Sequence, residues 1–150
     1  MADRANPVRI VLADDHQVMR RGLQLLLDAE PDLDVVGQAG DVESARSLVR
    51  EQRPDVLLLD VNMPGEPSLE AIPKLRAEAP KTQIVVLTMH EEPEVAQAAL
   101  RAGALAFVVK HAADNELIHA IRRAAAGETY LNRNLAGRLA AKRMLKGSWD

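Results

Sequence analysis

Acidic, hydroxyl and amine side chains follow the short apolar runs of this 150-residue chain. In chain order they are Asp14 and Asp15, Asp60, Thr88, and Lys110. Three carboxylates brought together repel one another unless a cation joins them, and a hard divalent ion such as Mg²⁺ suits oxygen ligands. A carboxylate can also attack phosphorus and form an aspartyl phosphate. These residue types therefore indicate phosphoryl transfer to an aspartate.

Asp60 is the most informative of these residues. It follows Val56–Leu59, an apolar run with a proline-containing turn on each side, which is typical of a buried parallel strand. The carboxyl ends of such strands form the rim where open α/β sheets bind their ligands. A transferred phosphoryl group needs its charge neutralised. Mg²⁺ and Lys110 can each neutralise part of it, and the Thr88 hydroxyl can donate to a third oxygen.

Each residue also has a simpler interpretation when taken alone. Asp14 or Asp15 could cap a helix that begins near Gln17, and a threonine at a strand end is often β-branched filler. His16 and His90 flank the cluster, but exposed loop histidines are commoner than metal-binding ones. The combination of four strand ends with complementary chemistry favours a site.

The elements that would position this site alternate along the chain. We expect strands at Val8–Ala13, Leu33–Gln38, Val56–Leu59, Gln83–Leu87 and Ala106–Val109. We expect helices at Gln17–Ala29, Val42–Gln52, Ser68–Ala79, Pro93–Ala102 and Asn115–Ala126. Strands that alternate with helices in this way favour βαβ units with right-handed crossovers. The sequence therefore predicts an α/β fold with a doubly wound parallel sheet and helices on both faces.

The pattern changes after residue 127. A short extended piece precedes a basic helical stretch, Asn132–Lys146, in which Leu135 and Leu139 lie on one side. Too little apolar surface remains there for a second core. We therefore expect one domain at 1–127 and a linker and tail helix at 128–150, with no output domain in this chain.

The amino-acid composition limits the classes of protein to which this chain can belong. The chain is 47% hydrophobic and 27% charged, as is usual for globular proteins, and its net charge of −3 gives no overall field that favours nucleic acid. The absence of cysteine excludes disulfides and thiolate metal sites. No segment has the length of a membrane span or the apolar stretch of a signal peptide, so we expect a cytoplasmic protein with no membrane partner.

Four motifs follow one another along the chain. They are Asp14-Asp15, Leu57–Gly65, Leu87-Thr88 and Phe107–Lys110. Over about residues 8–126 the chain resembles the receiver domain of bacterial response regulators. Within that family it most resembles the NarL/LuxR class, on Leu12–His16, Leu87–Glu92 and Ala126–Leu131. The resemblance implies a flavodoxin-like (βα)5 fold, as in CheY-like receivers.

The resemblance also implies a metal-dependent phosphorylation site. Asp60 would accept a phosphoryl group from a sensor histidine kinase. Mg²⁺, or Mn²⁺ in its place, would be bound by Asp15, Asp60 and the Asn62 carbonyl, and Asp14 would act through water. The module would catalyse only its own phosphorylation and dephosphorylation.

Three further residues match the output machinery of the family. Lys110 matches the phosphate-contacting lysine, and Thr88 and Phe107 match the switch pair. Phosphorylation would draw Thr88 inward, and Phe107 would move into the space vacated. The face carrying Pro93–Ala102 and Ala106–Val109 would then change shape. NarL/LuxR proteins continue into a helix-turn-helix, so we expect DNA binding and transcription regulation only through a domain outside this chain.

A weak homodimer is a further expectation. Ile118 falls outside the apolar stripe of its predicted helix, next to Ala125 and the stems of Arg122 and Arg123. With Arg20 and Arg21 on the first helix, these residues would form a small contact surface. Because NarL/LuxR receivers often dimerise through these helices, phosphorylation would promote the association.

Two departures from the family pattern leave alternatives open. Ser68 stands where relatives commonly have glycine, and His111 stands where many have a cis proline. A protein-interaction module, either a stand-alone receiver or a pseudo-receiver that acts as a scaffold, is therefore one alternative. A haloacid-dehalogenase-type phosphatase would need a second aspartate where this chain has Asn62. A flavin binder would need a phosphate-cradling loop in place of Asp14–His16.

Overall fold

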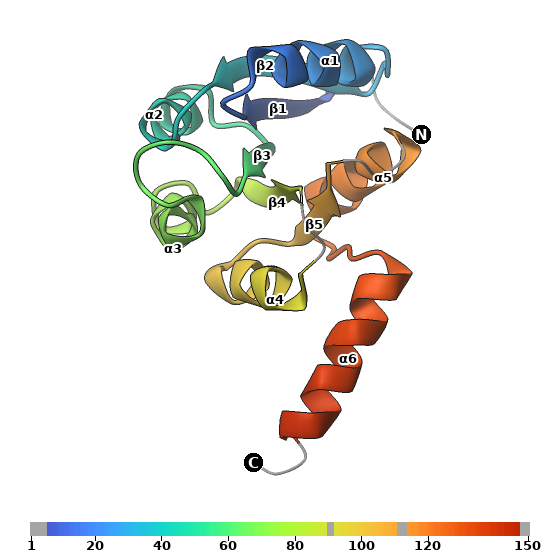
Figure 1. The fold of residues 1–150 in the computed structure, drawn as a ribbon. Helices are drawn as coiled ribbons and strands as arrows, with labels where there is room; N and C mark the ends of the chain where they lie inside the picture. The colour runs from blue at the N-terminus through green and yellow to red at the C-terminus, as the bar shows by residue number, and fades with distance from the viewer. Residues whose placement is uncertain (1–5, 90–91, 111–113, 148–150) are drawn as a thin grey trace.

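The structure is a computed structural model that describes residues 6–89, 92–110 and 114–147. One parallel sheet has the strand order β2-β1-β3-β4-β5 (Figure 1). The strands are β1 (Val8–Ala13), β2 (Leu33–Ala39), β3 (Val56–Asp60), β4 (Gln83–Thr88) and β5 (Ala106–Val109). The helices are α1 (Gln17–Asp28), α2 (Val42–Gln52), α3 (Ser68–Glu78), α4 (Pro93–Ala102), α5 (Asp114–Ala125) and α6 (Arg133–Gly147). The predicted fold is confirmed, and each predicted boundary lies within about one residue of the observed one.

Two hydrophobic cores lie on the two faces of the sheet. Side chains alternate along each strand, so Val11 and Ala13 of β1 face one core while Ile10 and Leu12 face the other. Helices α2, α3 and α4 cover the first core, and α1 and α5 cover the second. Phe107 of β5 is fully buried in the first core. Both faces of the sheet are thus shielded, which explains the almost continuous apolar strands.

The topology brings the predicted site residues to one edge of the sheet. Strand β1 lies between β2 and β3, so the chain reverses its direction of winding after β2. The register pairs Ala13 with Leu59 and Asp60 with Leu87. Parallel strands in this register end at the same level, and ligands bind at such a switch point.

The segment after α5 returns to the sheet. The amide of Tyr130 donates to the Leu105 carbonyl over 3.0 Å, and the amide of Phe107 donates to the Tyr130 carbonyl over 3.2 Å. Leu135, in the first turn of α6, is 0% exposed and packs in the first core near α4. Burying one leucine contributes roughly 1.5–3 kcal/mol, so this turn is anchored although α6 leads away from the body (Figure 1).

The expectation that Ile118 is exposed in a contact surface is wrong. Ile118 is only 8% exposed and belongs to the second core. Helix α5 packs over β3, β4 and β5, and it buries Leu117, Ile118 and Ile121 together. A helix that crosses three strands buries a wider stripe than the predicted one. The exposed apolar side chains of this region lie on α1 instead, with Val18 at 86% and Leu25 at 71%.

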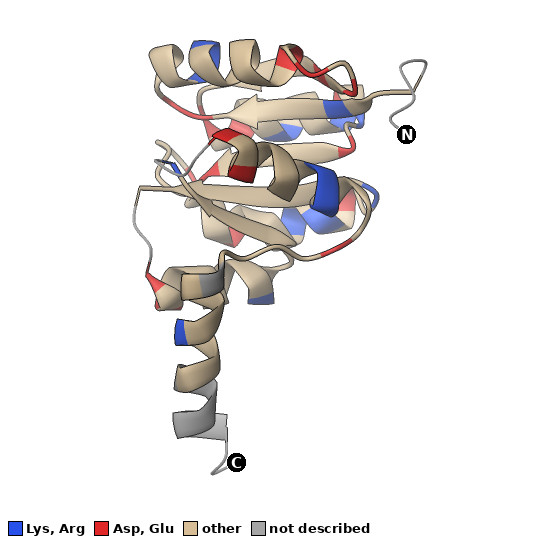
Figure 2. Cartoon of the chain, turned by 90° about the vertical axis from the view of Figure 1, so that its right-hand side faces the viewer, with Lys and Arg blue, Asp and Glu red and all other residues tan. Residues whose placement is uncertain are grey.

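Charges of both signs are interspersed on the face that Figure 2 shows. Among the described residues, no helix has the length and apolar character needed to cross a membrane.

Candidate functional site

Asp60 is a buried carboxylate at the end of a wholly buried strand. It is 1% exposed, and every residue of β3 is buried. Its Oδ1 accepts a hydrogen bond from the backbone amide of Asn62 over 3.0 Å. A side chain that bonds the amide two residues later forms a local turn, which fixes the direction of the carboxylate.

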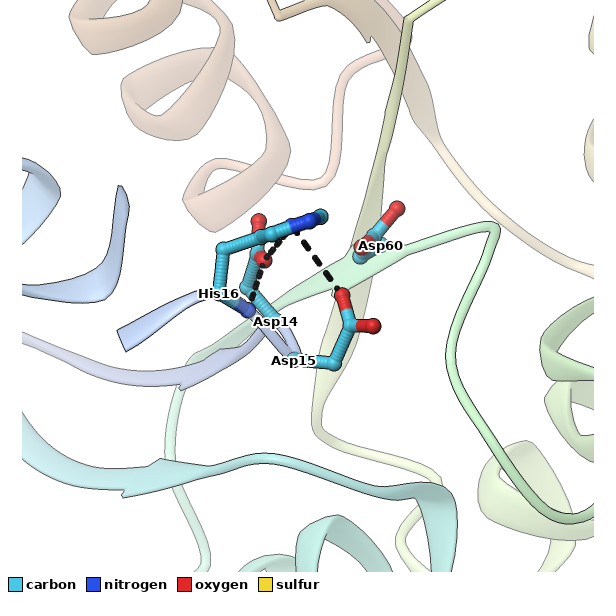
Figure 3. A group of neighbouring side chains, drawn as sticks. All are labelled: Asp14, Asp15, His16 and Asp60. Carbon is cyan, nitrogen blue, oxygen red and sulfur yellow. Dashed lines mark hydrogen bonds and ion pairs between the residues drawn. The ribbon is translucent and has the colours of Figure 1, made fainter. Parts of the chain in front are cut away.

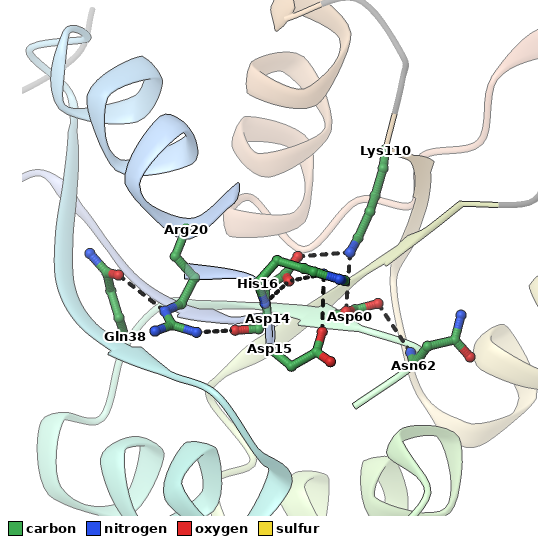
Figure 4. Close-up of polar contacts among 8 residues, drawn as sticks. All are labelled: Asp14, Asp15, His16, Arg20, Gln38, Asp60, Asn62 and Lys110. Atoms are coloured by element: carbon green, nitrogen blue, oxygen red, sulfur yellow. Dashed lines mark hydrogen bonds and ion pairs between the residues drawn. The ribbon is translucent and has the colours of Figure 1, made fainter. Parts of the chain in front are cut away.

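Lys110 joins Asp60 to a second buried carboxylate. Its Nζ lies 2.8 Å from Oδ2 of Asp14 and 3.1 Å from Oδ2 of Asp60 (Figure 4). The Lys110 side chain is only 4% exposed. Its position follows from the sheet, because the Lys110 amide donates to the Thr88 carbonyl over 2.6 Å and so continues the pairing of β4 and β5.

Burial works against the charge on Asp60. It raises the pKa of this carboxyl above its ordinary value, although the Asn62 amide and the Lys110 ammonium act in the opposite direction. For Lys110, burial alone would lower the pKa, but Asp14 and Asp60 outweigh burial and raise it. The ammonium therefore stays charged, while the negative charge on Asp60 is held at an energetic cost.

Asp14, Asp15 and His16 form the loop between β1 and α1 (Figure 3). Oδ1 of Asp14 accepts from the His16 amide over 2.8 Å. Nδ1 of His16 lies 3.3 Å from Oδ1 of Asp14 and 3.1 Å from Oδ1 of Asp15. Neither aspartate caps α1, because the residue at the cap position is His16 and it makes no side-chain cap bond. The capping interpretation is therefore wrong.

The donor set fits a divalent cation. One ligand atom from each of Asp14, Asp15, His16 and Asp60 lies within 4.8 Å of the other three. Three carboxylates face one ammonium, which leaves an excess of negative charge. The Oδ2 atoms of Asp14 and Asp60 share the same Lys110 ammonium as their ion-pair partner. Carboxylate oxygens are the ligands that Mg²⁺ prefers, so this cluster suits it.

The other predicted residues lie around the cluster. Thr88 is buried at the end of β4, and Asn62 is exposed in the loop after β3. Ser68 is the first residue of α3, and its buried hydroxyl has no hydrogen-bond partner among the described residues. His90 and His111 lie outside the described residues.

Arg20 is a contributor that the sequence interpretation missed. From α1 its Nη1 donates to the Asp14 backbone carbonyl, and its Nε donates to Oε1 of Gln38 over 3.3 Å (Figure 4). The guanidinium thus ties the acidic loop to β2. The sequence did contain a signal for this contact. Arg20 lies one helical turn after His16 and therefore on the same side of α1.

Comparison with known proteins agrees with this site. A model of the response regulator receiver domain matches residues 10–122. The chain is 40% identical over 129 residues to the oxygen regulatory protein NreC of Staphylococcus haemolyticus, a match that covers 85% of this chain. The match covers 59% of NreC, so this chain spans little more than half of that relative.

Solved structures show the same architecture. A LuxR-family two-component response regulator from Aurantimonas sp. SI85-9A1 superposes with a TM-score of 0.87 at 33% identity, over 93% of this chain and 99% of that one. The signal receiver domain of the putative response regulator NarL from Mycobacterium tuberculosis gives 0.78 at 32% identity, over 82% and 99%. Fold, acidic cluster and sequence matches agree: the chain belongs to the receiver domain family of two-component response regulators, among the NreC, NarL and LuxR-type regulators.

Proposed function

We propose that Asp60 is the phosphoacceptor of a signalling switch and takes its phosphoryl group from a sensor histidine kinase. The observation that carries the proposal is the buried Asp60 carboxylate, which lies beside Asp14 and 3.1 Å from the Lys110 ammonium. In the transfer, an Asp60 oxygen forms a bond to phosphorus as the bond between phosphorus and the donor's imidazole nitrogen breaks. The chain acts as a signalling module and not as an enzyme on an external substrate.

Named residues of this chain serve that transfer. Asp15, Asp60 and the Asn62 carbonyl would hold Mg²⁺, or Mn²⁺ in its place, and Asp14 would act through water. When bound, the ion would supply positive charge to the phosphoryl oxygens. Lys110 leaves Asp60 to contact a phosphoryl oxygen, while the Thr88 hydroxyl donates to another.

The direct test is phosphorylation in vitro. The protein is incubated with acetyl phosphate and Mg²⁺ and its intact mass is measured. We expect a gain of one phosphoryl group in the native chain and in Asp34→Asn, and none in Asp60→Asn. Asp34 is a suitable control because it is an exposed aspartate on β2. A mass gain that survives in Asp60→Asn, or that is unaffected by excess EDTA, would contradict the proposal.

We propose that the structural change caused by phosphorylation is transmitted through Thr88 and Phe107 to the C-terminal segment. Phe107 is already buried, and its amide is bonded to the Tyr130 carbonyl, so a shift of β5 reaches the segment that leads into α6. We propose that residues 1–127 form the receiver and that residues 128–150 link it to an output domain outside this chain. Transcription regulation by the parent protein belongs to this proposal.

Thr88→Ala tests the switch. Beryllofluoride should still bind to the variant, but amide shifts around Phe107 and Tyr130 in NMR spectra should be much smaller than in the native chain. Equal shifts in both proteins would show that the switch lies elsewhere.

A further inference from the structure

The ring of His16 is directed at the carboxylate cluster. Its Nδ1 lies within 3.3 Å of both Asp14 and Asp15, and the three side chains with Asp60 surround a common space (Figure 3). Several constraints set this arrangement. The His16 amide is bonded to Oδ1 of Asp14, and Arg20 holds the carbonyl of the same aspartate. His16 is thus placed over the site by its own loop.

We propose that His16 is an additional metal ligand, so that the site binds divalent transition-metal ions such as Mn²⁺ and Co²⁺ through an imidazole nitrogen as well as carboxylates. The inference rests on the proposed function, because it concerns the metal site next to Asp60. It goes beyond an oxygen-only site of Asp15, Asp60 and Asn62, since a nitrogen donor changes which metals are preferred.

The geometry allows Asp15, His16 and Asp60 to bind one ion directly, with Asp14 acting through water. Atoms bonded to one ion at about 2.1 Å stand roughly 3–4 Å from one another. The four candidate ligand atoms already lie within 4.8 Å of each other, so a small closing movement is sufficient. His16 and Asp15 are both exposed, and their side chains can make that movement while the buried Asp14 and Asp60 stay in place.

Ligand chemistry then predicts selectivity. Imidazole suits the later divalent transition metals better than Mn²⁺, and Mg²⁺ prefers oxygen and keeps several waters. His16 therefore strengthens the binding of Co²⁺ most and of Mn²⁺ less, and it has little effect on Mg²⁺. The opposing possibility is that His16 only hydrogen-bonds to Asp14 and Asp15. In that case the imidazole competes with every metal, and its removal tightens Mg²⁺ and Mn²⁺ alike.

Calorimetry and pulsed electron paramagnetic resonance test the inference on the full chain, with Mg²⁺, Mn²⁺ and Co²⁺ as separate probes. For His16→Ala we expect Co²⁺ affinity to fall about tenfold or more, Mn²⁺ affinity to fall less, and Mg²⁺ affinity to change less than about twofold. The Mn²⁺-loaded native protein should show coupling to a ¹⁴N nucleus that is lost in His16→Ala. His119→Ala is the control, because His119 packs against Tyr130 and should leave both readouts unchanged.

The outcomes separate this inference from the proposed function. Mn²⁺ bound without ¹⁴N coupling, or an equal change in Mg²⁺ and Co²⁺ affinity, overturns the role of His16 and leaves phosphorylation of Asp60 intact. Failure of the native protein to bind any of the three metals overturns both.

Discussion

Two clusters of acids and a base lie at opposite ends of this sheet, and they differ in their exposure to water. At the carboxyl ends of the strands, Lys110 pairs with Asp14 and Asp60, and all three side chains are at most 4% exposed. Before β2, at the other end, Arg122 pairs with Glu30 at 2.8 Å and with Asp32 at 2.7 Å. The Arg122 side chain is 43% exposed.

The pKa values of the two aspartates, Asp32 and Asp60, move in opposite directions. The hydrogen bond from Arg122 lowers the pKa of Asp32, and the same contact raises the pKa of Arg122. Burial raises the pKa of Asp60 despite its lysine. The exposed cluster therefore stabilises the charged forms of Asp32 and Arg122. In the buried cluster the surroundings destabilise the charged form of Asp60. An aspartate whose charged form is destabilised is suited to bind a metal and accept a phosphoryl group. Side chains with shifted pKa values concentrate at functional sites.

The largest effect is expected from removing the buried cation. Lys110→Met should lower the free energy of unfolding by about 3 kcal/mol without divalent metal, because two buried carboxylates lose their partner. Mg²⁺ should restore part of this loss. Urea unfolding with and without Mg²⁺ measures both effects. Lys74→Met is the control, since Lys74 pairs with Glu66 on the surface and its loss should cost less than about 1 kcal/mol. Equal losses in the two variants would show that burial does not set the cost of removing a paired lysine.

A smaller effect is expected at the exposed cluster. Asp32→Asn should lower the free energy of unfolding by less than about 1 kcal/mol at neutral pH, and added salt should reduce the difference. Because the pKa of Asp32 is lower in the folded protein, its contribution is present above the unfolded value of 3.8 and is lost as pH falls through the folded value.

The free energy of unfolding of Asp32→Asn should therefore fall less steeply with decreasing pH than that of the native protein. Unfolding measured from pH 2 to 7 tests this. A larger loss in Asp32→Asn than in Lys110→Met would reverse the comparison.

The smallest change concerns Tyr130, whose ionisation is opposed by burial. Burial and then the hydrogen bond to Glu116 raise the pKa of Tyr130 to about 12. Its contribution to stability is thus present below pH 10, the unfolded value, and is lost as pH rises through the folded value. Tyr130 is the chain's one tyrosine, so tyrosinate absorbance reports it directly. Glu116→Gln should lower the pKa only partly, and a native pKa near 10 would show that the segment before α6 is not docked.

Much of this fold could be predicted because its signals are local. Neighbouring residues are enough to recognise the apolar run before Asp60 and the alternation of strands with helices. A parallel sheet then brings the strand ends together. Asp14, Asp60 and Lys110 therefore meet as predicted.

The remaining features depend on contacts that local patterns do not show. The burial of Ile118 results from α5 crossing three strands, and that of Leu135 from the packing of α6 near α4. The His16 ring could point to solvent or to the cluster at the same position in the sequence. Its direction is set by the contacts of Nδ1 with the carboxylates of Asp14 and Asp15.

The central claim is that the charge on Asp60 opposes folding until a metal neutralises it. The most direct measurement is the free energy of unfolding of the native chain and of Asp60→Asn, each with EDTA and with Mg²⁺. We predict that Asp60→Asn is the more stable protein in EDTA. Mg²⁺ should stabilise the native chain by about 2.7 kcal/mol at a hundredfold excess over Kd and the variant much less. A variant that is less stable in EDTA, together with equal Mg²⁺ effects on both proteins, would contradict the claim.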